Sequence, residues 1–105
     1  MRELTGKNFE STVNTNGLVV VDFWAPWCGP CKALGPVLES LQQEMGSNVV
    51  FCKVDTDEHS ALAAEHEVSS LPFIQFWKDG RLVNTVSGAY PKHKIKAFIE
   101  EAALS

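Results

Sequence analysis

Two cysteines, Cys28 and Cys31, are separated by only two residues in the segment Trp27-Cys28-Gly29-Pro30-Cys31. Cysteines at this spacing can close a small disulfide, and in the first turn of a helix their sulfurs lie close together. The pair can therefore alternate between dithiol and disulfide with little movement of the backbone. Because a cysteine thiolate attacks disulfides through a mixed-disulfide intermediate, this spacing predicts thiol–disulfide exchange.

The two cysteines are expected to differ in reactivity. Cys28 lies at the start of a predicted helix, where unpaired backbone N–H groups and the helix dipole stabilise a thiolate. Cys31 lies one turn further on, within the apolar face of that helix, and is expected to be less exposed. Cys28 is therefore predicted to attack the partner's disulfide, and Cys31 then attacks Cys28 to release the reduced partner. Gly29 and Pro30 add no charge or donor that would stabilise the thiolate further, so the pair is expected to reduce disulfides.

The same cysteine spacing also occurs as half of a structural zinc site, which normally has four ligands. The other side chains that could complete such a site are scattered singly along the sequence: Cys52, His59, His66 and His93. None is paired with another at the spacing typical of zinc ligands, so no metal site is expected. A Cys-x-x-Cys pair that follows a buried strand and opens a helix instead indicates a redox motif.

A carboxylic acid interrupts the apolar segment before the cysteines: Asp22 lies six residues before Cys28. Burial of an ionised carboxylate is costly, so the pKa of Asp22 is expected to be raised. We hypothesise that Asp22 accepts the proton of Cys31, through a water molecule, when Cys31 attacks; the alternative is an edge carboxylate that caps a turn. Lys53 interrupts another apolar strand and is expected either near Asp22, where it would bias the charge of the carboxylate, or exposed to solvent.

The tryptophans and the third cysteine have simpler interpretations. Trp27 is expected at the surface beside Cys28, where it would shield the sulfur, and Trp24 is expected to pack beneath the site. Trp77 has the pattern of an ordinary core or sheet-surface aromatic residue. Cys52 occupies a buried-type position of a strand, which predicts a small hydrophobic side chain rather than a regulatory thiol.

The cysteine pair requires a strand that ends just before it and a helix that begins at it. The segment 18–24 is β-branched, aromatic and almost continuously apolar, which is typical of a central strand covered on both faces. A helix is predicted from about Cys28 to Met45, with Pro30 harmless in its first turn, Pro36 as a kink and Gly46 as its stop. Its apolar residues recur at steps of three and four: Cys31, Leu34, Leu38, Leu41 and Met45.

The remaining elements are a strand over 2–4, a helix over 7–13 capped by Thr5, a strand over 49–54, a helix over 59–67, strands over 72–78 and 81–87, and a last helix opened by Pro91. Alternating helices and strands in the first half imply right-handed crossovers between parallel strands. The Asp79-Gly80 turn implies an antiparallel hairpin. The predicted fold class is therefore α/β, with a mixed sheet and helices on both of its faces.

Composition is typical of a single globular domain over residues 1–105, with 45% hydrophobic and 21% charged residues. The net charge of −4 disfavours a nucleic-acid binder, which usually presents a clustered basic face. The basic cluster over 92–96 is followed by Glu100 and Glu101 and is expected to be a solvated helix face. No apolar run approaches the ~20 residues that span a bilayer, and no leader, retention or lipidation signal is recognised. A cytoplasmic protein without membrane attachment is expected.

Five segments carry a resemblance to a known family: Val21–Lys32, Lys53–Asp55, Leu71–Pro72, Lys78–Gly80 and Gly88–Ala89. Over essentially its whole length, the chain resembles the thioredoxin family. The resemblance implies the thioredoxin fold, a five-stranded mixed sheet flanked by four helices, and a cis peptide at Leu71–Pro72. It also implies a shallow groove in which the backbone of Leu71 pairs with an extended segment of the substrate.

The resemblance implies that this groove is lined by Trp27 and Pro30, on either side of Cys28 and Gly29, and by Pro72, Gly88 and Ala89. The resemblance further implies an electron-transport role in cell redox homeostasis, with a disulfide that an NADPH-dependent flavoprotein, thioredoxin reductase, reduces again. No bound cofactor is therefore expected. The implied clients are ribonucleotide reductase, peroxiredoxins and methionine sulfoxide reductases, and a monomer is expected.

Two other functional classes remain open at this point. A disulfide isomerase or oxidase domain would share the fold, although Gly29-Pro30 and the lack of a recognised leader or retention signal disfavour it. A non-catalytic binding subunit could use the same fold without its thiols.

Overall fold

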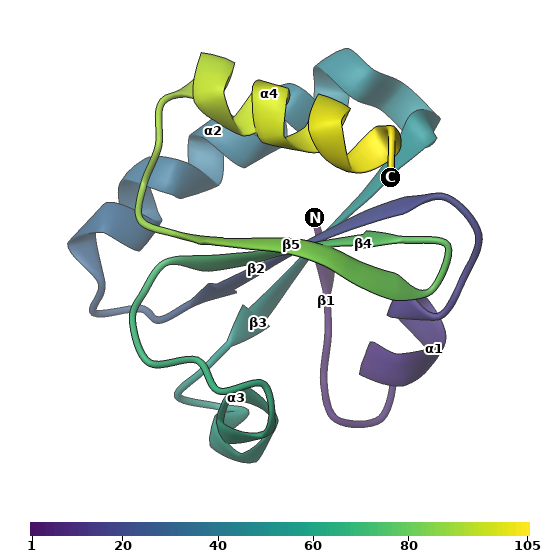
Figure 1. Ribbon diagram of the computed structural model, residues 1–105. Helices are drawn as coiled ribbons and strands as arrows, with labels where there is room; N and C mark the ends of the chain where they lie inside the picture. Colours follow the sequence, from purple (N-terminus) through teal and green to yellow (C-terminus); the bar gives the residue numbers. More distant parts are fainter.

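The computed structural model describes all residues, 1–105, as one sheet with helices packed on it (Figure 1). Its strands are β1 (Arg2–Glu3), β2 (Leu18–Trp24), β3 (Val49–Asp55), β4 (Phe73–Lys78) and β5 (Arg81–Ser87). Its helices are α1 (Phe9–Val13), α2 (Gly29–Met45), α3 (Ser60–Glu65) and α4 (Lys92–Ala103), with a short 3₁₀ turn η1 (Gly46–Asn48) after α2.

The five strands lie in the order β1-β3-β2-β4-β5. β3 runs parallel to both β1 and β2, whereas β4 is antiparallel to β2 and to β5. The predicted mixed sheet is therefore confirmed: the crossovers give the parallel pairs, the hairpin at Asp79-Gly80 gives the antiparallel β4–β5 pair, and β4 also pairs antiparallel with β2. β2 is the central strand, so the turn that follows it lies in the middle of the row of strand ends on that side of the sheet.

The side chains of β2 alternate between two apolar cores. Leu18 and Val20 face the core under α2 and α4, and Val19, Val21 and Phe23 face the core over α1 and α3. Figure 1 shows the two helix pairs on opposite sides of the sheet. Because side chains alternate along a strand, an even-numbered residue of β2 such as 22 is directed toward the α2 side.

α2 begins directly after β2 and positions the cysteine pair. Cys28 is its N-cap, Pro30 lies in its first turn, and Gly46 ends it with a φ of 61°. Proline in the first turn removes only an N–H that has no helical partner, whereas Pro36 inside the helix removes one backbone hydrogen bond. The predicted helix from Cys28 to Met45 is confirmed to within one residue.

The predicted start of α1 and the predicted end of α3 were wrong. α1 begins at Phe9, because Thr5–Asn8 form a turn closed by the Thr5 N–H on Asn8 Oδ1 at 2.6 Å. The Thr5 hydroxyl accepts the Lys7 N–H in that turn and does not cap the helix. α3 ends at Glu65, and Glu67 then takes a φ of 56°, which the right-handed helix cannot include.

The basic cluster lies on α4 and is paired with α2. The ammonium groups of Lys92 and Lys96 lie 3.1 and 2.6 Å from carboxylate oxygens of Glu44, and together they lower the pKa of that carboxyl. Lys92 also donates to the Ser40 hydroxyl at 2.9 Å. These contacts join two surface helices. Lys92, His93 and Lys94 are exposed, as predicted for a solvated helix face.

Candidate active site

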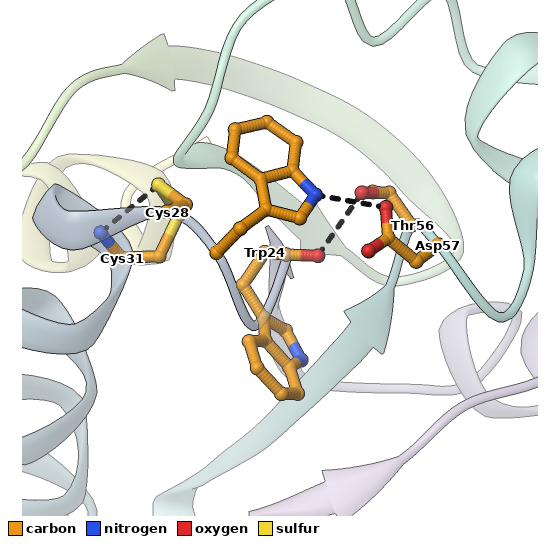
Figure 2. Close-up of a disulfide and its surroundings, with 6 residues drawn as sticks. Trp24, Cys28, Cys31, Thr56 and Asp57 are labelled. Carbon is orange, nitrogen blue, oxygen red and sulfur yellow. Dashed lines mark hydrogen bonds between the residues drawn. A yellow bond between two sulfur atoms is a disulfide. The ribbon is translucent and has the colours of Figure 1, made fainter.

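Cys28 and Cys31 are joined by a disulfide at the start of α2, with their Cα atoms 5.3 Å apart. Cys28 has an extended backbone, and its Sγ accepts the Cys31 N–H at 3.2 Å (Figure 2). This N–H is one of the amides at a helix N-terminus that have no carbonyl partner within the helix. The sulfur of Cys28 therefore receives a hydrogen bond that would stabilise its thiolate.

The predicted difference in exposure between the two cysteines is wrong for the disulfide state. Cys28 is 5% exposed and Cys31 is 4% exposed. Both sulfurs share a small apolar cluster with Ala25, against which Trp24 and Leu71 pack. Because neighbours from the preceding turn and from a distant loop cover both sulfurs, the sequence alone does not reveal the burial of Cys28. The asymmetry that remains is the hydrogen bond from Cys31 to Cys28.

Trp27, directly before Cys28, is exposed, with 69% of its surface accessible. Its indole N–H donates to Asp57 Oδ1 at 3.0 Å. Asp57 is in turn held by Asp55, whose Oδ1 accepts the backbone N–H groups of Asp57 and Glu58. The predicted surface position of Trp27 is confirmed. The sequence reasoning missed Asp55 and Asp57, although acidic residues directly after a predicted strand were a usable signal.

Trp24 occupies the predicted place beneath the cysteines, where its side chain packs against their cluster. Its carbonyl accepts the Thr56 hydroxyl at 3.1 Å (Figure 2). It also accepts the Thr56 backbone N–H at 2.9 Å. The Lys53 ammonium lies 5.5 Å from the centre of the Trp24 ring. Thr56 thus fixes the end of β2, from which the active-site turn departs.

Asp22 is buried on the α2 side of the sheet, with 3% of its surface exposed. Its Oδ1 accepts no hydrogen bond from the protein. Burial raises the pKa of Asp22 to about 7, and the charge of Lys53, its register partner on β3, opposes that rise. Asp22, Lys53 and Cys31 line one cavity of about 160 Å³. The structure thus brings together the three residues that the sequence singled out around the proton transfer.

The loop before β4 approaches the disulfide from the other side. The Leu71–Pro72 peptide is cis, as predicted, and Leu71 packs against the cysteine cluster. The Gly88 N–H donates to the Pro72 carbonyl at 2.9 Å, and Gly88 has a φ of 107°, which favours glycine. Ala89 follows at the exposed end of this segment. Gly29 and Pro30 are exposed beside the pair. The predicted groove residues thus lie on three segments: the active-site turn, the Leu71–Pro72 loop that contacts the cysteine cluster, and the Gly88–Ala89 segment that is hydrogen-bonded to Pro72.

Cys52 is fully buried in the core on the α1 and α3 side, as predicted for a small hydrophobic residue. Burial raises the pKa of its thiol to about 11. Trp77 also packs against this core, and its indole N–H donates to the buried Gln75 amide oxygen at 3.0 Å.

No three His, Cys, Asp or Glu side chains are grouped as metal ligands. The chain has no helix with the length and apolar character of a membrane span.

A family model described as thioredoxin matches residues 1–101. The thioredoxin of Bacillus subtilis is 43% identical over 91 residues, which cover 87% of this chain and 88% of that protein. The thioredoxin of Porphyra purpurea is 38% identical over 100 residues, which cover 94% of each chain. The similarity therefore extends far beyond the cysteine motif.

Solved structures agree with these sequence matches. The thioredoxin of Malassezia sympodialis (Mala s 13) superposes with a TM-score of 0.89 at 37% identity, over 98% of this chain and 90% of that one. The thioredoxin of Plasmodium falciparum gives 0.88 at 36% identity, over 96% and 98%. A chain from a study of thiol resolution in yeast mitochondrial 1-Cys peroxiredoxin via glutathione and thioredoxin systems gives 0.88 at 34% identity, over 96% and 94%.

Proposed function

Since the chain belongs to the thioredoxin family and is a dithiol–disulfide oxidoreductase, we propose that it works as a reductant, with Cys28 as the attacking thiol. The observation that supports this most directly is the Cys31 N–H on Cys28 Sγ at the start of α2. That hydrogen bond favours the thiolate of Cys28 over that of Cys31. Gly29 and Pro30 add no further stabilisation, so the reduced form keeps its reducing power.

The reaction begins when the Cys28 thiolate attacks one sulfur of a client disulfide. A bond forms between Cys28 and the client, the client disulfide breaks, and the second client sulfur leaves as a thiolate that takes a proton from water. The Cys31 thiolate then attacks Cys28, the mixed disulfide breaks, and the first client sulfur leaves in the same way. The client gains two electrons, and the pair closes its disulfide.

Asp22 is proposed to accept the Cys31 proton in the second step, through a water molecule in the cavity that the two side chains share. A carboxyl with a pKa of about 7 can both take and return a proton near neutral pH. Lys53 favours the ionised form of Asp22 by its charge, so we propose that it positions and tunes the base. Trp27, Leu71 and the residues around Pro72 are proposed to hold the client segment beside Cys28.

Replacing Asp22 with alanine is expected to slow the decay of the mixed disulfide by roughly a hundredfold at pH 7, since a positioned general base commonly contributes that factor. The rates of variant and wild type should converge at high pH, where hydroxide removes the proton of the Cys31 thiol without a general base. Acid quenching followed by mass spectrometry measures this decay between about pH 5 and pH 10. A variant with the wild-type pH profile would remove Asp22 from the mechanism.

The proposed partners follow from the reducing role. An NADPH-dependent thioredoxin reductase would return the Cys28–Cys31 disulfide to the dithiol, and clients with exposed disulfides would accept the electrons. Peroxiredoxins, ribonucleotide reductase and methionine sulfoxide reductases are the client types proposed, and the chain is proposed to act as a monomer. A reducing dithiol needs a reducing compartment, which supports a cytoplasmic location.

The reduction potential of the pair tests the reducing role against the oxidase or isomerase alternative. We expect the Cys28–Cys31 couple to equilibrate at or below the cytosolic glutathione poise of about −240 mV, because only one amide and no charged group contacts the Cys28 sulfur. Equilibration with mixtures of reduced and oxidised dithiothreitol, followed by thiol alkylation, measures the potential. A value well above that of the glutathione pool would identify the chain as an oxidant.

A further inference from the structure

A pair of side-chain hydroxyls joins the loop before β4 to the end of β5. Ser70 Oγ and Ser87 Oγ lie 2.9 Å apart, and either hydroxyl can be the donor. Ser70 directly precedes Leu71, and Ser87 is the last residue of β5. Both serines are exposed. The Ser70–Ser87 pair therefore links two surface segments that are seventeen positions apart in the sequence.

This pair and one backbone hydrogen bond hold the residues on both sides of Leu71. The Pro72 carbonyl, which follows Leu71, accepts the Gly88 N–H at 2.9 Å. The Ser70 hydroxyl, which precedes Leu71, is bonded to Ser87. Two consecutive residues, Ser87 and Gly88, thus fix both neighbours of Leu71. The N–H and the carbonyl of Leu71 itself enter no backbone hydrogen bond within the chain.

The loop that carries Leu71 has few other attachments. α3 ends at Glu65 and β4 begins at Phe73, so no helix or strand includes the intervening residues. From Ser69 to Leu71, the hydrogen bond of the Ser70 hydroxyl is the one hydrogen bond to the rest of the chain. The direction of the Leu71 backbone groups therefore depends on this bond, on the bond at Pro72 and on the packing of Leu71 against the cysteine cluster.

The direction of these groups matters to a client that pairs with them. A hydrogen bond weakens steeply when its donor angle falls below about 120°, so a turned Leu71 peptide pairs poorly with an extended segment. The apparent dissociation constant of a client rises as the fraction of molecules with the competent loop falls. A contact that holds the Leu71 backbone in place therefore increases client affinity.

We propose that the Ser70–Ser87 pair positions the Leu71 backbone for clients whose disulfide lies in an extended polypeptide. Both serines act through Leu71, so they are positioning residues for client affinity and leave the attack by Cys28 unchanged. A small disulfide without peptide groups has nothing to pair with Leu71, and its reduction should not depend on the serines. The inference rests on the proposed function, in which Cys28 attacks a client held at Leu71.

The cysteine pair is independent of the two hydroxyls. The cluster around the sulfurs contains Ala25, Trp24 and Leu71 but neither serine. The amide that Cys28 Sγ accepts comes from α2. Because both serines are exposed, a hydroxyl that loses its partner is solvated by water, and no buried polar group is left unpaired. Alanine at either position is therefore compatible with folding and with an unchanged nucleophile.

The test uses a Cys31→Ser parent, in which the adduct on Cys28 accumulates. Its formation is followed by acid quenching and mass spectrometry with a peptide disulfide and with 2-hydroxyethyl disulfide. Adding Ser70→Ala should raise the half-saturating peptide concentration roughly three- to tenfold, the factor that one neutral hydrogen bond contributes. The limiting rate, and the rate with the small disulfide, should equal those of the parent. Ser87→Thr keeps the hydroxyl and should resemble the parent, as should Ser69→Ala, an exposed neighbour outside the pair.

The double variant Ser70→Ala/Ser87→Ala separates a shared bond from two separate client contacts. If the hydroxyls act through their mutual bond, the double variant should match each single one, because both changes remove the same interaction. Additive effects would overturn the proposal, as would an unchanged half-saturating concentration or equal losses with both disulfides. These three results would leave the role of Cys28 intact. Absence of an adduct on Cys28 with either disulfide would overturn the proposed function and the positioning role with it.

Discussion

Cys28→Ser is expected to abolish the reduction of insulin disulfides, with a rate at least about a thousandfold below that of the wild type. A serine hydroxyl stays protonated near neutral pH and cannot replace a thiolate as the attacking group. Cys31 cannot take over, because it lies one turn into α2 and its sulfur does not receive the amide hydrogen bond that Cys28 Sγ receives. Turbidity from the precipitating insulin chains, with dithiothreitol as the electron donor, gives the rate.

Two matched variants show whether the loss is specific to the attacking thiol. Cys31→Ser should still attack client disulfides and should accumulate the mixed disulfide on Cys28, because the group that resolves it is missing. Cys52→Ala should reduce insulin at nearly the wild-type rate, since the Cys52 thiol is fully buried away from the pair and its pKa is about 11. Insulin reduction that survives Cys28→Ser, or a trapped adduct on Cys31, would contradict the assigned roles.

The parts of this site that follow from local sequence were predictable. The apolar segment 18–24 specifies a central strand, and the cysteines at the start of a strongly periodic helix specify where the thiols lie. The raised pKa of Asp22 also follows, because a carboxylate within such a strand is buried wherever the strand is covered on both faces. The sequence left open whether Lys53 lies near Asp22 or is exposed to solvent. The structure places Lys53 beside Asp22, as its register partner on β3.

Other features depend on contacts between distant segments, and the sequence did not reveal them. The burial of Cys28 results from Leu71, which approaches from a loop forty-three positions away. The hydrogen bond from Trp27 to Asp57 joins the loop before α2 to the loop after β3, thirty positions apart in the sequence. α1 starts late because a side-chain amide closes a turn before it. In each case tertiary packing or a local hydrogen bond outweighs helix propensity or pattern.

Asp22→Asn is expected to stabilise the oxidised protein at pH 8 by up to about 4 kcal/mol. Burial raises the pKa of Asp22 from 3.8 to about 7, so between these values the folded state binds a proton that the unfolded state does not. Stability therefore falls as the pH rises through this range, and at 1.36 kcal/mol per pH unit the total cost is about 4 kcal/mol. Asparagine has no charge to bury, so the variant avoids this cost at every pH.

The pH dependence of the difference is the decisive observation. Urea unfolding of the two oxidised proteins should show the full gap in the free energy of unfolding at pH 8, a smaller gap at pH 6, and little difference near pH 4, where Asp22 is neutral in both states. Glu101→Gln, which neutralises an exposed carboxylate on α4, is the control and should show no such trend. A gap that stays constant with pH, or an asparagine variant that is less stable at pH 8, would mean that Asp22 is not held in the buried, poorly solvated state that its role as a proton acceptor near neutral pH requires.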